Sequence, residues 1–233
     1  MYALLDWDNT LRRGATLFAW MDFLCEEKHV LSRKIIDNRL EIGRRCRAGE
    51  ISHDTLCGLC TLNYVEGVRG MKEEDYKRYV KEFLEWDKGL DIPSNTALLD
   101  FLRRHDIPII IASGSPYNLI RDMCEEMGVI KAFCFTEDVE NGVLTGTASD
   151  DAGGNKQLAV DYGFERFGEP PLLAAGDSSS DFPMLDAAKI RVVIGDKREM
   201  AERYPDAIFV DLSAEGAAHL EESLAKIEKE MGL

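Results

Sequence analysis

The sequence predicts an α/β protein in which a doubly wound parallel sheet is interrupted near its N-terminus by an all-helical insertion. Short apolar runs typical of buried strands alternate with helical patterns along most of the 233 residues. Several of these runs end in polar clusters, and open α/β sheets bind ligands at the carboxyl ends of their strands. Strand signals are missing from residues 14–90, so we expect a helical domain there and an α/β core built from residues 1–13 and 91–233.

The first predicted strand is the apolar run 2–5, which leads directly into the acidic segment 6–10 (DWDNT). Side chains alternate along an extended segment, so Asp6 and Asp8 are expected to point to the same side. Two crowded carboxylates repel each other unless a cation or a shared proton relieves them. The pair indicates a site for a hard metal such as Mg2+, or a nucleophile with an acid/base partner. The alternative is that residues 8–10 only cap the following turn.

Four helical patterns follow in the insertion. The two patterns from about Ser32 to Arg47 and from about Ser52 to Val68 begin at serines that suit N-caps. The other two patterns, first and last in the insertion, have apolar residues at helical spacing. These residues are Leu17, Trp20, Met21, Leu24 and Cys25 in the first pattern, and Tyr76, Tyr79, Val80, Phe83 and Leu84 in the last. Most of these apolar residues are expected to form the core of a helical bundle.

From Asp91 onward the alternation of strands and helices resumes. The predicted strands are residues 108–112, about 130–135, 172–175, 190–194 and 207–210, and helical patterns separate most of them. The pair Asn141-Gly142 is a two-residue turn signal between antiparallel strands. Lys156 lies at the predicted start of a helix, and a final helix carries Leu220 and Leu224. This order is typical of a parallel, doubly wound sheet.

Polar residues at three strand ends are candidates for a shared site. They are Asp6 and Asp8 after the first strand, Ser113 after the run 108–112, and Asp177 and Asp181 after the run 172–175. Parallel strands share one carboxyl edge, so these residues can meet in space, and Lys156 can join them. Four carboxylates in one pocket need a divalent cation and a basic side chain. With a hydroxyl donor, this set can stabilise a phosphoryl group during transfer.

The order DxDxT, strand-end serine, lysine and GDxxxD resembles the haloacid dehalogenase (HAD) superfamily over essentially the whole chain. The stretch 175–185 (AGDSSSDFPML) is similar to the phosphoserine-phosphatase-like branch, and so is a helical insertion directly after the first motif. The resemblance implies a Rossmann-like core with a helical cap. It also implies a Mg2+-dependent phosphatase that acts on a small phosphorylated substrate.

The resemblance assigns a role to each motif residue. Asp6 would be the nucleophile that forms an aspartyl-phosphate, and Asp8 would be the general acid and then the general base. Ser113 would hydrogen-bond a phosphoryl oxygen together with the backbone of Gly114. Lys156 would neutralise the phosphate and the charge of the nucleophile. The alternative for Lys156, from sequence alone, is an ordinary surface lysine.

The resemblance also implies the ligands of the metal. Mg2+ would be held by the Asp6 carboxylate, the Asp8 backbone carbonyl and Asp177, with Asp181 contributing directly or through water. The alternative for Asp181 is a role as N-cap of the helix that begins at Phe182.

A second aspartate beside a complete GDxxxD motif favours hydrolysis of phosphate monoesters. Two alternatives remain open, which are a phosphotransferase with the same intermediate and a non-catalytic protein that binds phosphometabolites. Two departures from phosphoserine phosphatases argue against phosphoserine as the substrate. Ala15 replaces the substrate-binding glutamate, and the helix around Cys60 lacks the arginine that takes the substrate carboxylate. Trp7 and Trp20 could form a ring-binding wall or could pack in the core.

Composition limits the partners and the location. The 43 acidic and 28 basic residues give a net charge of −15, which argues against nucleic acid as a main partner. No apolar stretch can span a membrane and no signal-peptide pattern begins the chain, so we expect a cytoplasmic protein without a membrane partner. The six scattered cysteines indicate reduced thiols, and Cys57 and Cys60, without a second pair, are expected to pack in a helix. Oligomeric state has no signature in the sequence.

Overall fold

The computed structural model describes residues 1–87, 91–149, 155–195 and 198–232. Its seven strands form one sheet in the order β4-β3-β2-β1-β5-β6-β7. All neighbours are parallel except β3 and β4. The strands are β1 (Ala3–Leu5), β2 (Ile109–Pro116), β3 (Val129–Glu140), β4 (Val143–Ser149), β5 (Leu173–Gly176), β6 (Ile190–Ile194) and β7 (Ile208–Val210). The predicted α/β class with a mostly parallel sheet is confirmed.

Strand β1 is the centre of the sheet and brings the predicted site residues to one edge. Its three residues pair in parallel with Ile109, Ile110 and Ile111 of β2 on one side. On the other side they pair with residues 173–175 of β5. The segments that follow β1 and β5, and the last residues of β2, therefore lie next to each other. This is the carboxyl edge at which α/β sheets bind ligands.

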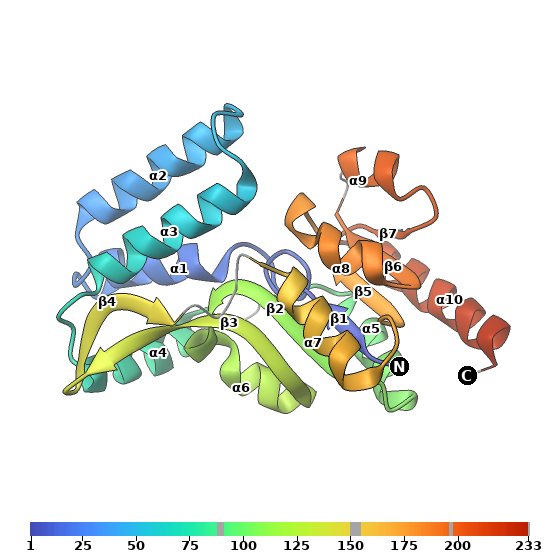
Figure 1. Cartoon of the computed structure of the whole chain (residues 1–233). Helices are drawn as coiled ribbons and strands as arrows, with labels where there is room; N and C mark the ends of the chain where they lie inside the picture. The colour runs from blue at the N-terminus through green and yellow to red at the C-terminus, as the bar shows by residue number, and fades with distance from the viewer. Residues whose placement is uncertain (88–90, 150–154, 196–197, 233) are drawn as a thin grey trace.

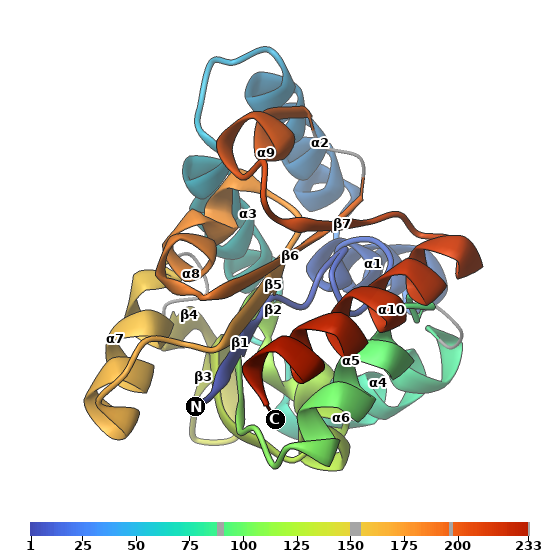
Figure 2. The same ribbon diagram turned by 90° about the vertical axis from the view of Figure 1, so that its right-hand side faces the viewer.

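Helices cover both faces of the sheet, as the doubly wound class requires. The core helices are α5 (Asn95–Arg104), α6 (Tyr117–Met127), α7 (Gln157–Phe167), α8 (Phe182–Ala187), α9 (Arg198–Arg203) and α10 (Ala214–Met231). Figure 2 shows α5, α6 and α10 on one side of the sheet and α7 and α8 on the other. Successive residues of a strand point to opposite faces of the sheet, so the protein has a hydrophobic core on each face. In β1, Ala3 and Leu5 belong to one core and Leu4 belongs to the other.

Between β1 and β2 the described chain is helical. The insertion (residues 14–87) contains α1 (Thr16–Asp22), a π-helical turn (Phe23–Glu27), α2 (Arg33–Arg47), α3 (His53–Gly67) and α4 (Glu73–Trp86). Figure 1 shows α1, α2 and α3 on the side of the molecule opposite α8, α9 and α10. Ser52 caps α3 as predicted, because its hydroxyl accepts the N–H of Thr55, whereas the Ser32 side chain makes no capping bond. Residues 88–90, at the predicted end of the insertion, lie outside the described residues.

Two strands are longer than predicted, and each extension has a structural reason. Strand β3 continues past Phe135 because it leaves β2 and pairs with β4 in an antiparallel hairpin through Asn141-Gly142. Strand β2 continues through residues 113–115, where its register with β3 shifts between Ala112 and Pro116. Such irregularities re-aim side chains at the ends of strands beside active sites.

Polar contacts between described residues tie the insertion to the core beyond the chain connections. Arg12 forms a buried ion pair with Asp87, with distances of 2.6–2.9 Å between its guanidinium and the two carboxylate oxygens. Main-chain hydrogen bonds of 2.9 Å also join Gly70 and Met71 to Leu144 of the hairpin. None of the helices in the described ranges is long and apolar enough to cross a membrane.

Candidate active site

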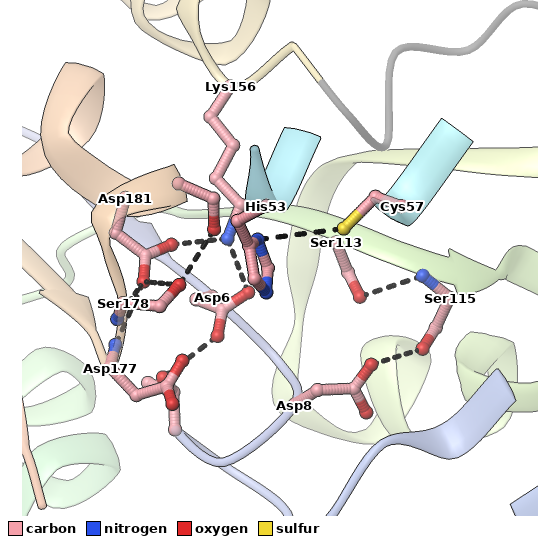
Figure 3. A network of polar contacts seen from close by, with 12 residues as sticks. Asp6, Asp8, His53, Cys57, Ser113, Ser115, Lys156, Asp177, Ser178 and Asp181 are labelled. Atoms are coloured by element: carbon pink, nitrogen blue, oxygen red, sulfur yellow. Dashed lines mark hydrogen bonds and ion pairs between the residues drawn. The ribbon is translucent and has the colours of Figure 1, made fainter. Parts of the chain in front are cut away.

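Three buried aspartates meet at the carboxyl edge of the sheet (Figure 3). Asp6 is the first residue after β1, and Asp177 is the first after β5. Asp181 lies one short helical turn later, in the segment Ser179–Asp181. One carboxylate oxygen from each of the three lies within 4.8 Å of the others. The predicted convergence of segments separated by about 170 residues in sequence is present in the structure for these three acids.

Lys156 lies between two of these acids, so it is not a surface lysine. It is 5% exposed, its Nζ is 2.5 Å from Asp6 Oδ1, and it also donates to Asp181 Oδ1. Burial alone would lower the pKa of the ammonium group, but the charges of Asp181 and Asp6 outweigh burial and raise the pKa above its ordinary value. Lys156 is therefore a permanent positive charge beside the Asp6 carboxylate.

Asp6 is held in one orientation by donors on both of its oxygens. Lys156 contacts Oδ1, and the Thr10 hydroxyl donates to Oδ2 at 2.9 Å. Burial raises the pKa of Asp6 well above its ordinary value, Lys156 opposes this rise, and Asp181 and Asp177 add to it. One ammonium group cannot balance three buried carboxylates. The donor set, three carboxylates with a shortage of positive charge, fits a hard divalent cation such as Mg2+.

Asp181 is fully buried, and protein donors engage both of its oxygens. Its Oδ2 accepts the backbone N–H groups of Asp177 and Ser178, each at 2.8 Å, while Oδ1 accepts from Lys156. Asp181 does precede α8, but its side chain makes no capping bond to that helix. Instead it reaches back to the N-cap of its own short turn. These bonds suit a residue that orients Asp177 and Lys156.

The chain passes close to Asp181 only because residue 176 is glycine. A Cβ atom on Gly176 would lie 2.5 Å from both Cβ and Cγ of Asp181. The glycine of the GDxxxD motif thus makes room for the carboxylate that organises the rest of the site. This reason for the glycine is steric, since its φ angle is not in the left-handed region.

The Asp8 carboxylate faces the same cavity as Asp6 but has different partners. Its Oδ1 accepts both the N–H and the hydroxyl of Thr16, at 2.8 and 2.6 Å. Its Oδ2 accepts the hydroxyl of Ser115 at 2.6 Å. The predicted group of four carboxylates is therefore a group of three, with Asp8 held separately between β2 and the first residue of α1. The chain turns after Trp7, whose carbonyl accepts three successive N–H groups, and this turn separates the two aspartates.

Ser113 and Gly114 lie on the bulged end of β2, next to Asp8. Gly114 lines the cavity, and the buried Ser113 hydroxyl accepts the N–H of Ser115 at 3.1 Å. Sequence reasoning missed Ser115 and Thr16 as partners of Asp8. The repeated serine in the segment 113–115 was the available signal for the first of them.

A cavity of about 280 Å3 opens above the acids, between the sheet edge and the insertion. Its charged side contains Asp6, Asp8, Lys156 and Asp177. Its insertion side is lined by Ala15, Leu17, Phe18, His53, Asp54, Leu56, Cys57 and Cys60. Cys57 and Cys60 lie in α3 as free thiols, as predicted, and burial raises the pKa of Cys57 to about 12. A thiol with such a pKa is protonated at neutral pH.

Both tryptophans considered for a ring-binding wall are packed in the interior instead. Trp7 is 2% exposed and donates its indole N–H to the Thr16 hydroxyl at 3.0 Å. Trp20 is fully buried and donates to the Tyr64 hydroxyl at 2.9 Å. Neither lines the cavity above the acids. The core-packing alternative is confirmed, because each ring is enclosed and each indole N–H has a partner.

Comparisons with known proteins identify the family of the chain. The haloacid dehalogenase-like hydrolase family matches residues 3–186, and the chain therefore belongs to that family. No curated protein sequence matches the chain.

Solved structures with the same fold are distant in sequence. A phosphoserine phosphatase, in a structure of a phospho-aspartyl intermediate analogue, is 17% identical with a TM-score of 0.64, and the match covers 91% of this chain and 93% of that one. A probable phosphoserine phosphatase from Vibrio cholerae is 16% identical with a TM-score of 0.69, over 99% and 67% of the two chains. Cytosolic 5'-nucleotidase IIIB bound to cytidine is 14% identical with a TM-score of 0.64, over 98% and 87%. At these identities the likeness concerns the fold.

Proposed function

We propose that the protein is a Mg2+-dependent phosphatase that hydrolyses a small phosphate monoester through a phosphorylated Asp6. The observation that carries this proposal is the buried contact between Asp6 and Lys156 beside Asp177 and Asp181. A carboxylate with a fixed orientation, next to a permanent cation and at the floor of a cavity, is equipped to attack a phosphoryl group. Membership of a hydrolase family supports the same reaction class.

The acidic cluster supports the choice of Mg2+. Asp6, Asp177 and the backbone carbonyl of Asp8 would hold the ion, and Asp181 would orient Asp177 through its backbone N–H. When bound, Mg2+ supplies positive charge that offsets the acids and the phosphate. Lys156 contributes the remaining positive charge, because it contacts the nucleophile directly.

Asp6 and Asp8 divide the chemistry between them. A carboxylate oxygen of Asp6 attacks phosphorus, the bond from phosphorus to the ester oxygen breaks, and Asp8 gives its proton to the departing alkoxide. Asp8 then takes a proton from a water molecule, which attacks the aspartyl-phosphate and releases phosphate and free Asp6. Lys156 and Thr10 keep Asp6 in place, and Ser115 and Thr16 do the same for Asp8.

We infer that phosphoserine is not the preferred substrate. Ala15 and Cys60, the two positions that lack the charged residues of phosphoserine phosphatases, both line the cavity. A cavity without those groups leaves the carboxylate and ammonium of phosphoserine unpaired. A cytoplasmic location is consistent with the free thiols of all six cysteines.

Hydrolysis of p-nitrophenyl phosphate by the purified protein, with Mg2+ and with EDTA, tests the proposal. We expect release that depends on Mg2+ and that falls by roughly a thousandfold or more in Asp6→Asn. Asp122→Asn, a 60% exposed position on α6, is the matched control and should keep full activity. Undiminished release by Asp6→Asn, or none from the wild type at any Mg2+ concentration, would contradict the proposal. Product analysis with added alcohols shows whether water or an alcohol accepts the phosphoryl group.

A further inference from the structure

The insertion side of the cavity has a different chemistry from the acidic side. Leu17 and Phe18 from α1 face Leu56, Cys57 and Cys60 from α3 across the space above Asp6. Since the phosphoryl group has to lie against Asp6 and Lys156, the rest of the substrate has to lie against this apolar wall. The wall therefore selects the alcohol part of the ester.

Two described cations lie in or next to the cavity, Lys156 and Arg39, and both already have carboxylate partners. The only lysine or arginine among the described residues that line the cavity is Lys156, and its contacts are Asp6 and Asp181. Arg39 lies just behind the wall, with its guanidinium 5.1 Å from the centre of the Phe18 ring. It donates to the Phe18 carbonyl at 2.9 Å and pairs with Asp22 at 2.8 Å, which holds it outside the cavity.

The polar groups of the wall suit a neutral partner. His53 and Asp54 lie at the start of α3, at the rim of the cavity. The Nδ1 atom of His53 is 3.7 Å from Cys57 Sγ, a contact that Figure 3 marks with a dashed line. The other ring nitrogen can exchange a hydrogen bond with a hydroxyl group, whereas the Asp54 carboxylate would repel a substrate anion.

We infer that the substrate is the phosphate monoester of an uncharged alcohol whose carbon chain or ring packs against Phe18 and Leu56. The inference rests on the proposed function and adds the substrate class. A charged group packed against Phe18 and Leu56 would lose its water without gaining a partner there, since His53 and Asp54 are exposed at the rim. Sites discriminate strongly against that loss. Phe18 and Leu56 are the specificity-determining residues.

A series of matched alkyl phosphates tests the inference. The probes are pentyl phosphate and the same chain ending in a carboxylate or in an ammonium group, so that the leaving alcohols differ only in terminal charge. We expect kcat/KM to be higher for pentyl phosphate than for either charged ester by roughly tenfold or more. The corresponding phosphonates are not hydrolysed and can be tested as inhibitors of p-nitrophenyl phosphate hydrolysis. The pentyl phosphonate should have a lower Ki than either charged phosphonate.

Two variants connect the preference to the wall. Leu56→Lys adds a cation at a half-buried position and should reverse the preference between the pentyl and carboxylate esters, by roughly tenfold in the ratio of kcat/KM. Leu62→Lys is the matched control, because Leu62 is on the same helix, is 65% exposed and does not line the cavity. Phe18→Ala should reduce the advantage of pentyl phosphate and raise the Ki of its phosphonate. Thermal melting of each variant confirms that it is folded.

The outcomes separate the inference from the proposed function. Equal or better use of a charged ester, with active Asp6-dependent hydrolysis of p-nitrophenyl phosphate, overturns the substrate class and leaves the phosphatase in place. An unchanged order of phosphonates in folded Leu56→Lys also overturns it. Absence of any Asp6-dependent hydrolysis overturns the proposed function, and the inference falls with it.

Discussion

The two sides of one cavity are built in opposite ways. On the acidic side, each oxygen of Asp6 and Asp181 has an identified donor, and the donors come from segments that directly follow strands or precede helices. On the insertion side, the lining consists mostly of apolar side chains on α1 and α3, whose neighbours on the same helices are packed in the core. A substitution on the acidic side therefore disrupts a network of linked hydrogen bonds. A substitution on the insertion side changes the contacts of one side chain.

This difference indicates where mutations should affect chemistry and where they should affect selection. Replacing a residue on the acidic side leaves buried charges unpaired, which costs both stability and rate. Replacing a residue on the insertion side changes the shape and polarity of a surface and should alter KM for particular esters.

Lys156→Met removes the cation that contacts Asp6 and Asp181. We expect a loss of activity of roughly a thousandfold or more, and a fall in the free energy of unfolding of about 3–5 kcal/mol without Mg2+, because buried carboxylates lose their partner. Urea denaturation at neutral pH measures the stability. Lys189→Met, at a position 48% exposed, is the control and should change stability by less than about 0.5 kcal/mol. A folded, fully active Lys156→Met protein would show that the acidic side tolerates change as well as the insertion side does.

Gly176→Ala tests how tightly the acidic side is packed. The added methyl group would lie 2.5 Å from Asp181, so the carboxylate has to move and loses its bonds to Lys156 and the Asp177 N–H. We expect a loss of about 1–3 kcal/mol in stability and a clear decrease in kcat. Gly58→Ala on α3 is the counterpart in the insertion, where a Cβ meets nothing within 4 Å. It should stabilise the protein by about 0.5–1 kcal/mol, and equal effects of the two substitutions on melting temperature and kcat would refute the contrast.

The acidic side was largely predictable because its residues follow strands that are evident from their apolar runs. Asp6, Asp177 and Asp181 meet because β1 and β5 are neighbours in a parallel sheet. For Lys156, the order of the motifs favoured a site residue over an ordinary surface lysine, and Lys156 contacts Asp6. The partners of Asp8 were not predictable in the same way. Ser115 reaches it only because β2 shifts register there, and no sequence pattern specifies that shift.

The insertion side could not be predicted because an apolar residue in a cavity looks like an apolar residue in a core. Phe18 and Trp20 are two residues apart on α1, yet Phe18 lines the cavity and Trp20 is fully buried. The rotation of α1 about its axis decides between them, and that rotation follows from packing against the other helices. The choice between a ring-binding wall and core packing for Trp7 and Trp20 was left open by the sequence for this reason.

Ser115→Ala probes the point where the two sides meet, since Asp8 is held by Ser115 of β2 and by Thr16 of the insertion. Losing the 2.6 Å hydrogen bond should cost about 1 kcal/mol in stability and lower kcat/KM by roughly tenfold for an alkyl phosphate. The decrease should be smaller for p-nitrophenyl phosphate, because its leaving group needs little help from an acid. Ser149→Ala, at the exposed end of β4, is the control. Equal decreases for both substrates would mean that Ser115 does not act through Asp8.

Glu137 extends the contrast, because it is a buried carboxylate whose hydrogen-bond partners are neutral. Its oxygens accept from the Tyr64 hydroxyl at 2.6 Å and from the Asn118 amide at 3.3 Å, at the junction of α3 and β3. Burial raises the pKa of Glu137 above its ordinary value of 4.5, and the Tyr64 hydrogen bond only partly opposes this rise. Between the ordinary pKa and the raised one, the folded state binds more protons than the unfolded state. The free energy of unfolding therefore falls as pH rises through this window.

Glu137→Gln removes this titration, so the stability of the variant relative to the wild type should improve as pH increases from 4.5 into the neutral range. Urea denaturation across this range measures the change, with Glu140→Gln, exposed on the same strand, as the control. A relative stability independent of pH would mean that neutral donors stabilise the Glu137 carboxylate as well as water does.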